Sequence, residues 1–386
     1  MERIPKNIAL VYDRVNKWGG AERVLLALHD LFPDAPLFTS VYEKGQAPWA
    51  KVFPEVITSF LQKIPLASSH HEFFPFLTPL AFESFSFSQY DAVISVTSAD
   101  AKGIVTSPGT FHLCYCLTPT RYLWSHREDY KKQLNPLLEI ISRPSFKYLK
   151  HWDRIASQRP DTYVSISETV RQRVRQYYGR DSDIVYPPVD ISRFKVRQKG
   201  NLVSEFENGY FLYVSRLVPY KRADVVVEAF TKSGLPLIVA GTGSISWGGN
   251  SYVGNLKKNA GPNVRFVGEV SEGELVSLYK NSRAVVFFNE EDFGIVPVEA
   301  QAAGKPVIGL NRGGLTETVI NGKTGILVDD DSSDSLISVT RDFDEKKFDT
   351  KIITKNSEKF SLERFNSEFV KVLATKWQTY RSIYTS

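Results

Sequence analysis

Cysteine and long apolar runs are scarce in this chain of 386 residues, and each shortage excludes a class of protein. Its two cysteines, Cys114 and Cys116, stand one residue apart on an expected strand, so they share a face and can form neither an ordinary disulfide nor a complete zinc-ligand set. No run of eighteen apolar residues is present to suggest a membrane span. The first residues pass directly into an expected strand and lack the apolar core of a signal peptide. We therefore expect a cytoplasmic protein, with peripheral contact at the inner face of the cell membrane as the only membrane association.

Low-complexity tracts and internal repeats are also missing, and 42% hydrophobic with 24% charged residues is the composition of an ordinary globular protein. The length exceeds that of a single core, so two domains are expected.

The net charge of +5 is modest, but cations gather in the first half. Most such clusters of cations simply lie on helix faces that point to solvent. The alternative is that they bind an anionic membrane surface or a lipid diphosphate. A nucleic-acid partner is not expected. These cations are Lys147, Lys150, Arg154, Arg159, Arg171, Arg173, Arg175 and Arg180.

The two halves of the chain open in the same way, with an apolar strand, a glycine- or loop-containing turn and an amphipathic helix. In the first half the strand at 7–12 is followed by Gly19, Gly20 and a helix, and in the second half the strand at 210–214 is followed by a loop and a helix. This pattern predicts an α/β fold of two Rossmann-like, doubly wound domains. We place the first domain at 1–187 and the second at 188–360, separated at Pro187 and Pro188, with a C-terminal helix at 361–386 that packs back onto the first domain.

The segment 290–304 carries the most chemical information. An apolar strand precedes it, Pro297 suits the first helical position, and Gly304 ends the helix. Unpaired backbone N–H groups near Ile295 and Val296 would bind a phosphate there. The segment's two acids, Glu291 in the loop and Glu299 in the expected first turn, either cap the helix or bind hydroxyl groups beside that phosphate.

Two cations follow the first strand of the second half. Arg216 and Lys221 stand at the carboxyl end of that strand, where open α/β sheets bind ligands, and a guanidinium with an ammonium could neutralise a diphosphate. Surface cations without a ligand are the alternative interpretation. Gly241 begins a Gly-x-Gly turn that could cradle a nucleotide, although most such turns have no ligand.

Together these residues resemble the retaining glycosyltransferases of the GT-B fold, glycosyltransferase family 4, over nearly the whole chain. Glu291 and Glu299 match the Glu-x7-Glu motif of that family, and Gly19-Gly20-Ala21-Glu22, Ser215-Arg216 through Lys221, and Gly313-Gly314 support the match. The resemblance implies two Rossmann-like domains that face a central cleft.

The resemblance also implies residue roles. Arg216 and Lys221 would bind the donor diphosphate, Glu299 the ribose hydroxyls, and Glu291 the sugar. The backbone of Phe293, Gly294, Ile295 and Val296 would contact the sugar and the β-phosphate, while Gly19 and Gly20 would let their loop approach the phosphates. Arg216, Lys221 and Glu291 are accordingly the catalytic candidates, and no metal or other cofactor is expected, because protein cations take the charge-neutralising role.

Within the family, the segment 114–124 resembles the branch that transfers mannose from GDP-mannose. Relatives commonly carry a sugar-contacting histidine just before Thr-Pro, where this chain has Leu117, so that role is not transferable. His112 is interpreted as structural. Acceptor contacts are assigned to Arg121, Tyr122, Trp124 and His126, with core packing as the alternative for the aromatic side chains.

The expected function is therefore retaining transfer of a hexose, mannose from GDP-mannose, to a glycan or lipid-linked saccharide in surface polysaccharide or glycoconjugate synthesis. Three alternatives stay open: a transferase that uses UDP-glucose, UDP-galactose or UDP-N-acetylglucosamine, a non-catalytic nucleotide-sugar-binding assembly subunit, and an epimerase of the same fold.

Overall fold

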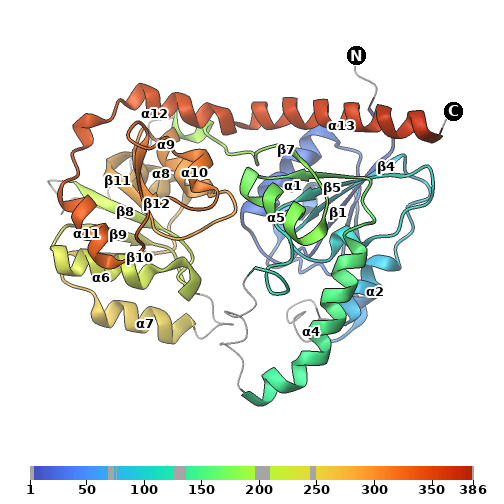
Figure 1. Ribbon diagram of the computed structural model, residues 1–386, viewed down its shortest axis with the longest axis horizontal. Coiled ribbons are helices and arrows are strands. Elements are labelled where there is room, and N and C mark those ends of the chain that lie inside the picture. The colour runs from blue at the N-terminus through green and yellow to red at the C-terminus, as the bar shows by residue number, and fades with distance from the viewer. Residues whose placement is uncertain are drawn as a thin grey trace. The chain divides into compact units, whose positions relative to one another are not determined.

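The computed structural model describes residues 4–67, 74, 76–125, 136–195, 209–243 and 249–384. The chain divides into two compact units, each described by itself below. The first unit comprises Met1–Pro188 together with Phe365–Ser386, and the second comprises Val189–Arg364. Each unit is a sheet with helices packed around it (Figure 1).

In the first unit the described strands form one parallel sheet in the order β3-β2-β1-β4-β5-β6-β7. Adjacent strands keep a regular register, with Leu10 of β1 opposite Ile94 of β4 and Ser95 of β4 opposite Cys114 of β5. The strands are β1 (Ile8–Tyr12), β2 (Leu37–Thr39), β3 (Val56–Thr58), β4 (Ala92–Thr97), β5 (Phe111–Cys116), β6 (Thr162–Ser165) and β7 (Asp183–Ile184). Residues of β1, β4 and β5 are almost fully buried, as expected for a parallel sheet covered on both faces.

The helices of the first unit pack on the two faces of this sheet. They are α1 (Gly20–Leu31), α2 (Leu77–Glu83), α4 (Pro136–Ala156), α5 (Glu168–Tyr178) and most of α13 (Leu362–Tyr384). Phe82 of α2 joins Val11 and Val93 in one core. From Phe365 onward α13 lies against the strands, with Phe365 and Phe369 packed on Tyr115. Ser361 caps α13 as expected, since its hydroxyl accepts a hydrogen bond of 3.2 Å from the N–H of Arg364.

In the second unit the described strands form a second parallel sheet in the order β10-β9-β8-β11-β12-β13. The strands are β8 (Tyr210–Val214), β9 (Leu237–Ala240), β10 (Val264–Gly268), β11 (Ser282–Phe287), β12 (Val307–Leu310) and β13 (Gly325–Val328). The helices are α6 (Ala223–Ser233), α7 (Gly249–Asn259), α8 (Glu272–Asn281), α9 (Ile295–Ala302), α10 (Leu315–Thr318), α11 (Ser333–Arg341) and α12 (Thr350–Ser357). Strand order reverses between β8 and β11, the point at which such sheets bind ligands.

Successive side chains of β8 point to opposite faces of this sheet, and each face has its own hydrophobic core. Phe211 and Tyr213 pack with α6 and α11, whereas Tyr210 and Leu212 pack with α8 and α9. The fold is therefore the doubly wound α/β class predicted from the sequence, in both units. Because the strands are parallel, the loops that follow β8, β9, β11 and β12 all leave from the same edge of the sheet.

Candidate functional site

Lys221 and Glu291 come from the loops after two neighbouring strands, β8 and β11, and form an ion pair. Their side chains are largely buried, 15% and 14% exposed. Asn289 fixes the carboxylate further, because its amide donates a hydrogen bond of 2.9 Å to the same oxygen, Oε1. The structure thus brings together two of the three predicted catalytic residues, and the charge of each offsets that of the other.

Arg216 joins this pair through Tyr220. Its guanidinium donates a hydrogen bond of 2.7 Å to the Tyr220 hydroxyl, while the Lys221 ammonium lies 5.3 Å from the centre of the Tyr220 ring. Arg216 is exposed. The turn is held in place because the Tyr213 hydroxyl donates to the carbonyl of Lys221 at 2.8 Å. Two cations therefore stand at the carboxyl end of β8, and the second of them is already paired with an acid.

Glu299 lies in a different environment from Glu291. It is 3% exposed, it pairs with the Arg193 guanidinium, and its Oε2 accepts a hydrogen bond of 2.8 Å from the Tyr279 hydroxyl. Both carboxylate oxygens of Glu299 are thus engaged within the second unit. Arg193 was missed by the sequence analysis: it lies 106 residues from Glu299 along the chain, and no motif links the two.

The helix start differs from the expectation by two positions. α9 begins at Ile295, so Pro297 is its third residue and Glu299 lies beyond the first turn, which carries no acid. The prediction placed Pro297 first because proline is most frequent there. Proline is tolerated at the third position too, since N–H groups of the whole first turn lack intrahelical partners. The end is as predicted, with Gly304 in the left-handed region at φ +77° just after the helix.

Glycines let the loop after β12 pack directly on the loop that carries Glu291. The N–H of Gly314 donates to the carbonyl of Glu291 at 2.8 Å, and a Cβ at Gly314 would overlap the Cα of Phe293. Gly294, at φ +88°, turns the chain into α9. The Phe293 side chain points into the protein and packs 5.4 Å from the ring of Phe360. Only the backbone of Phe293 is thus placed to act in a ligand site.

Gly241 is required for packing within the second unit. It has φ +128°, and a Cβ there would overlap the carbonyl oxygen of Ser215. The next residue, Thr242, accepts a hydrogen bond of 2.9 Å from the N–H of Leu217. The loop after β9 therefore supports the loop that carries Arg216.

Gly19 and Gly20 belong to the first unit, where Gly19 immediately precedes α1. Gly19 is extended, and a Cβ there would approach Glu22 Oε2 to 3.1 Å. Glu22 is itself buried and accepts a hydrogen bond of 2.6 Å from the Tyr12 hydroxyl, so this turn closes around a buried acid.

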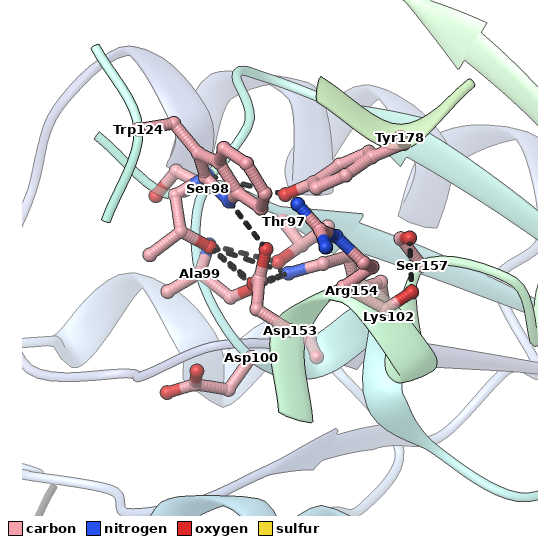
Figure 2. Close-up of polar contacts among 12 residues, drawn as sticks. Thr97, Ser98, Ala99, Asp100, Lys102, Trp124, Asp153, Arg154, Ser157 and Tyr178 are labelled. Atoms are coloured by element: carbon pink, nitrogen blue, oxygen red, sulfur yellow. Dashed lines mark hydrogen bonds and ion pairs between the residues drawn. The ribbon is translucent and has the colours of Figure 1, made fainter. Parts of the chain in front are cut away.

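Trp124, predicted to contact an acceptor, is packed against other side chains (Figure 2). Its indole N–H donates to Asp153 Oδ2 at 2.7 Å, its ring stacks on Tyr177, and the Lys150 ammonium lies 4.4 Å from the ring centre. Tyr122 packs on Phe146, and burial raises its pKa well above the ordinary value. Arg121 is half-buried, and His126 lies outside the described residues.

Behind Trp124 is a buried ion pair that the sequence did not reveal. Lys102 and Asp153 lie 2.5 Å apart, 2% and 0% exposed, and Thr120 donates to the same carboxylate oxygen at 2.7 Å. Figure 2 shows Asp100 on the loop beside them, with its carboxyl group directed away from this network. Burial raises the pKa of Asp100 to about 7, although the nearby Lys102 acts in the opposite direction. A cavity of about 180 Å³, lined by Leu123, Phe146, Lys147 and Lys150, adjoins this segment.

Two further expectations for β5, which concern its cysteines and His112, are confirmed. Cys114 and Cys116 are free thiols in the core. His112 is fully buried beside Ser95, 2.8 Å from its hydroxyl, and burial lowers the pKa of the imidazole to about 3, so it is a neutral structural residue. Within the described ranges no group of three or more His, Cys, Asp or Glu side chains is arranged to hold a metal ion. Among the described helices, none combines the length and hydropathy needed to cross a membrane.

The second unit is similar in sequence to known glycosyltransferases. Residues 195–360 match the family model of Glycosyl transferases group 1. A GDP-mannose-dependent alpha-(1-6)-phosphatidylinositol monomannoside mannosyltransferase of Mycobacterium tuberculosis is 33% identical over 199 residues, 45% of this chain and 50% of that protein. A D-inositol 3-phosphate glycosyltransferase of Rhodococcus jostii is 30% identical over 195 residues, 46% of this chain and 43% of that protein. The aligned region thus spans about half the length of these curated relatives.

Solved structures match over nearly the whole chain. The Anabaena protein HepE in complex with UDP-glucose gives a TM-score of 0.69 at 19% identity, covering 96% of this chain and 100% of that one. A sucrose-phosphate synthase of Thermosynechococcus elongatus gives 0.66 at 17% identity, covering 98% and 100%. These likenesses concern the fold, which is that of GT-B glycosyltransferases. The family match to Glycosyl transferases group 1 covers residues 195–360, less than half of the chain.

Proposed function

We propose that this protein is a retaining glycosyltransferase that moves a hexose, mannose from GDP-mannose, to a glycan or lipid-linked saccharide. The observation that carries the proposal is the arrangement of Arg216, Lys221 and Glu291 at the carboxyl ends of β8 and β11, in a unit that matches the family model of Glycosyl transferases group 1. The mannose assignment is supported by the mannosyltransferase of Mycobacterium tuberculosis and by the sequence around Cys116 to Trp124.

The proposed chemistry breaks the bond between the anomeric carbon and the leaving phosphate oxygen and forms a bond from that carbon to the acceptor oxygen. The hydroxyl proton passes to an oxygen of the departing diphosphate on the same face, so no enzyme nucleophile is needed. Arg216, Lys221 and the N–H groups at the start of α9 stabilise the charge that develops on the diphosphate. Glu291 would orient the sugar, and Glu299 would accept hydrogen bonds from the ribose hydroxyls. We propose no metal, because these groups take its charge-neutralising role.

A UDP-sugar donor is the second candidate. It is supported by HepE, whose structures contain UDP and UDP-glucose. Both donors present the same diphosphate and differ in base and sugar, so the contacts of Arg216 and Lys221 do not distinguish between them.

A panel of GDP-, UDP-, ADP- and dTDP-sugars tests the proposal. Thermal shift reports binding, since a ligand specific for the folded state raises the transition temperature, and turnover with and without EDTA reports catalysis. We expect the largest shift and turnover with GDP-mannose, activity that persists in EDTA, and an anomerically retained product by NMR. If a UDP-sugar is preferred, the donor assignment to GDP-mannose is wrong. If activity is lost in EDTA and restored by Mn²⁺ or Mg²⁺, the reaction depends on a metal. A product with inverted anomeric configuration would overturn the retaining mechanism. Binding without donor hydrolysis or transfer would favour a non-catalytic binding subunit.

A further inference from the structure

Tyr220 lies between the two cations of the predicted diphosphate site. It is the middle residue of the short helical turn Pro219–Lys221, which belongs to the loop after β8. Its hydroxyl accepts the hydrogen bond of 2.7 Å from the Arg216 guanidinium, and the Lys221 ammonium lies 5.3 Å from the centre of its ring. One side chain therefore contacts both cations, and no role was predicted for it from the sequence.

The backbone that carries Tyr220 is held in place by neighbouring residues. Pro219 opens the turn with a fixed φ angle, and the N–H of Lys221 donates to the carbonyl of Val218 at 3.0 Å. The Tyr213 hydroxyl, from β8, donates to the carbonyl of Lys221 at 2.8 Å. A tyrosine has only two side-chain torsions, so ordering its ring costs little conformational entropy. A rigid turn thus presents the ring of Tyr220 to two long and flexible cationic side chains.

The chemistry of the tyrosine side chain suits each of the two cations. Its hydroxyl oxygen has lone pairs that accept from the guanidinium of Arg216, and its ring face attracts the ammonium of Lys221. Like charges repel each other, so a partner that attracts both offsets the cost of keeping them close together. Arg216 is exposed, and the hydrogen bond restricts rotamers that an exposed arginine would otherwise populate. Charges held in place before the reaction stabilise a leaving group without further reorganisation.

We propose that Tyr220 is a positioning residue that holds Arg216 and Lys221 where a diphosphate requires both charges. The inference rests on the proposed function, which gives these two cations the donor diphosphate as their ligand. The hydroxyl acts on Arg216 and the ring acts on Lys221, so the two contributions can be removed separately. Tyr220→Phe deletes the hydroxyl and keeps the ring, whereas Tyr220→Leu deletes both. Tyr220 is 41% exposed, so neither change opens a cavity in the core, and urea unfolding should show unchanged stability.

A double-mutant cycle tests the contact with Arg216. We expect Tyr220→Phe to lower kcat/KM for a nucleotide-sugar donor about ten-fold, the effect of losing one hydrogen bond to a charged group. In an Arg216→Ala background the same change should alter kcat/KM by less than about two-fold, because the group that the hydroxyl holds is then missing. Calorimetry with inorganic pyrophosphate should give the same pattern of affinities. A merely structural tyrosine would give equal losses in both backgrounds.

A second cycle tests the contact with Lys221. Tyr220→Leu should lower kcat/KM by about a further three-fold relative to Tyr220→Phe, since it also removes the attraction between the ring and the ammonium. In a Lys221→Ala background Tyr220→Leu and Tyr220→Phe should have the same efficiency. A further loss that persists in that background would mean that the ring does not act through Lys221.

Tyr252→Phe is the matched control for the loss of a hydroxyl. Tyr252 is on α7 in the same unit, and its hydroxyl donates a hydrogen bond of 2.9 Å to Asp224. We expect its kcat/KM to stay within about two-fold of the wild type. NMR relaxation of the Arg216 Nε–H group gives a readout that needs no donor: its motion on the ps–ns timescale should be restricted in the wild type and should increase in Tyr220→Phe but not in Tyr252→Phe.

The outcomes separate this inference from the proposed function. If the wild type transfers sugar and Tyr220→Phe is equally active, or if the losses in the Arg216 cycle are additive, the positioning role is wrong and the proposed function stands. Equal mobility of Arg216 in the wild type and in Tyr220→Phe would also overturn the role. If the wild type binds pyrophosphate but transfers no sugar, the proposed function fails, and the pyrophosphate cycle with the relaxation data decides the role of Tyr220 by the same criteria. A wild type that binds no diphosphate would overturn both.

Discussion

The ammonium of Lys221 and the carboxylate of Glu291 form an ion pair that joins the loop after β8 to the loop after β11. A donor diphosphate would therefore meet Lys221 already engaged with an acid, while Arg216 stands beside it on Tyr220 with its charge exposed. In the proposed reaction the two cations stabilise the diphosphate, whereas Glu291 restrains Lys221.

Removing either cation should reduce turnover strongly without unfolding the protein. We expect Arg216→Ala and Lys221→Ala each to lower kcat/KM by the equivalent of about 2 to 4 kcal/mol, because each removes a charge that stabilises the leaving diphosphate. Steady-state kinetics measures the effect. The matched control is Lys232→Ala, which breaks a surface ion pair with Glu228 whose side chains are 54% and 52% exposed, and which should leave kcat/KM unchanged. A variant of Arg216 or Lys221 with wild-type efficiency would remove that residue from the diphosphate site.

Neutralising Glu291 should affect nucleotide binding and sugar transfer in different ways. In Glu291→Gln the amide oxygen can still accept from Asn289, but Lys221 is no longer balanced by a negative charge. We expect calorimetry to give unchanged or tighter affinity for the free nucleoside diphosphate, by up to about ten-fold, roughly 1.4 kcal/mol. Sugar transfer should fall, because the proposed sugar contact weakens. A large loss of affinity for the free nucleotide would show instead that Glu291 holds the nucleotide.

Glu299 should contribute to stability as well as to any ligand contact. It pairs with Arg193 in a buried setting, so Arg193→Met leaves a buried carboxylate without its partner cation, at a cost of about 3 to 5 kcal/mol. We expect Glu299→Leu to cost a similar amount and the double variant to cost clearly less than the sum of both. Urea unfolding of the four proteins provides the cycle. Strict additivity would contradict coupling between the two residues.

The close contact at Gly314 should be sensitive to a single methyl group. Gly314→Ala forces a Cβ onto the backbone of Phe293, which must displace the loop that carries Glu291. We expect a loss of about 2 kcal/mol in unfolding free energy and a large fall in turnover. Gly254→Ala is the control: Gly254 lies within α7 with open space around it, so alanine should be neutral or should stabilise by up to about 1 kcal/mol. Turnover of Gly314→Ala close to that of the wild type would show that this loop tolerates displacement.

Regular features of the fold could be predicted from local pattern. The strand at 210–214, the helix after it, the glycine at the end of α9 and the cap at Ser361 were all expected and are present, because each is encoded within a few neighbouring residues. The start of α9 was misplaced, since proline is accepted at more than one position of a first turn.

Partners from distant segments could not be predicted in the same way. Arg193 and Glu299 are 106 residues apart, and Lys102 and Asp153 are 51 apart, so only the assembled sheets bring them together. Trp124 illustrates the same limit. Its indole ring stacks on Tyr177, which belongs to a helix later in the chain, and no pattern near Trp124 indicates that contact.

Asp100 should make stability depend on pH in a direction opposite to that of an ordinary paired acid. Its folded pKa is raised from 3.8 to about 7, chiefly by burial, with Lys102 opposing and Asp13 adding to the shift. Between about pH 4 and pH 7 the folded state therefore binds the proton and the unfolded state does not, so this group stabilises the fold at low pH and the contribution is lost as pH rises toward 7.

The comparison with Asp100→Asn isolates this effect, because asparagine fills nearly the same volume and cannot ionise, while other titrating groups contribute to both proteins. We expect the unfolding free energy of the wild type, relative to Asp100→Asn, to fall by up to about 1.4 kcal/mol per pH unit across that window and to level off above it. Urea unfolding at several pH values measures the difference. A difference that stays constant from pH 4 to pH 8 would mean that the Asp100 carboxyl titrates as it does in the unfolded chain. A difference that rises with pH would mean that contacts of the ionised carboxylate outweigh its burial.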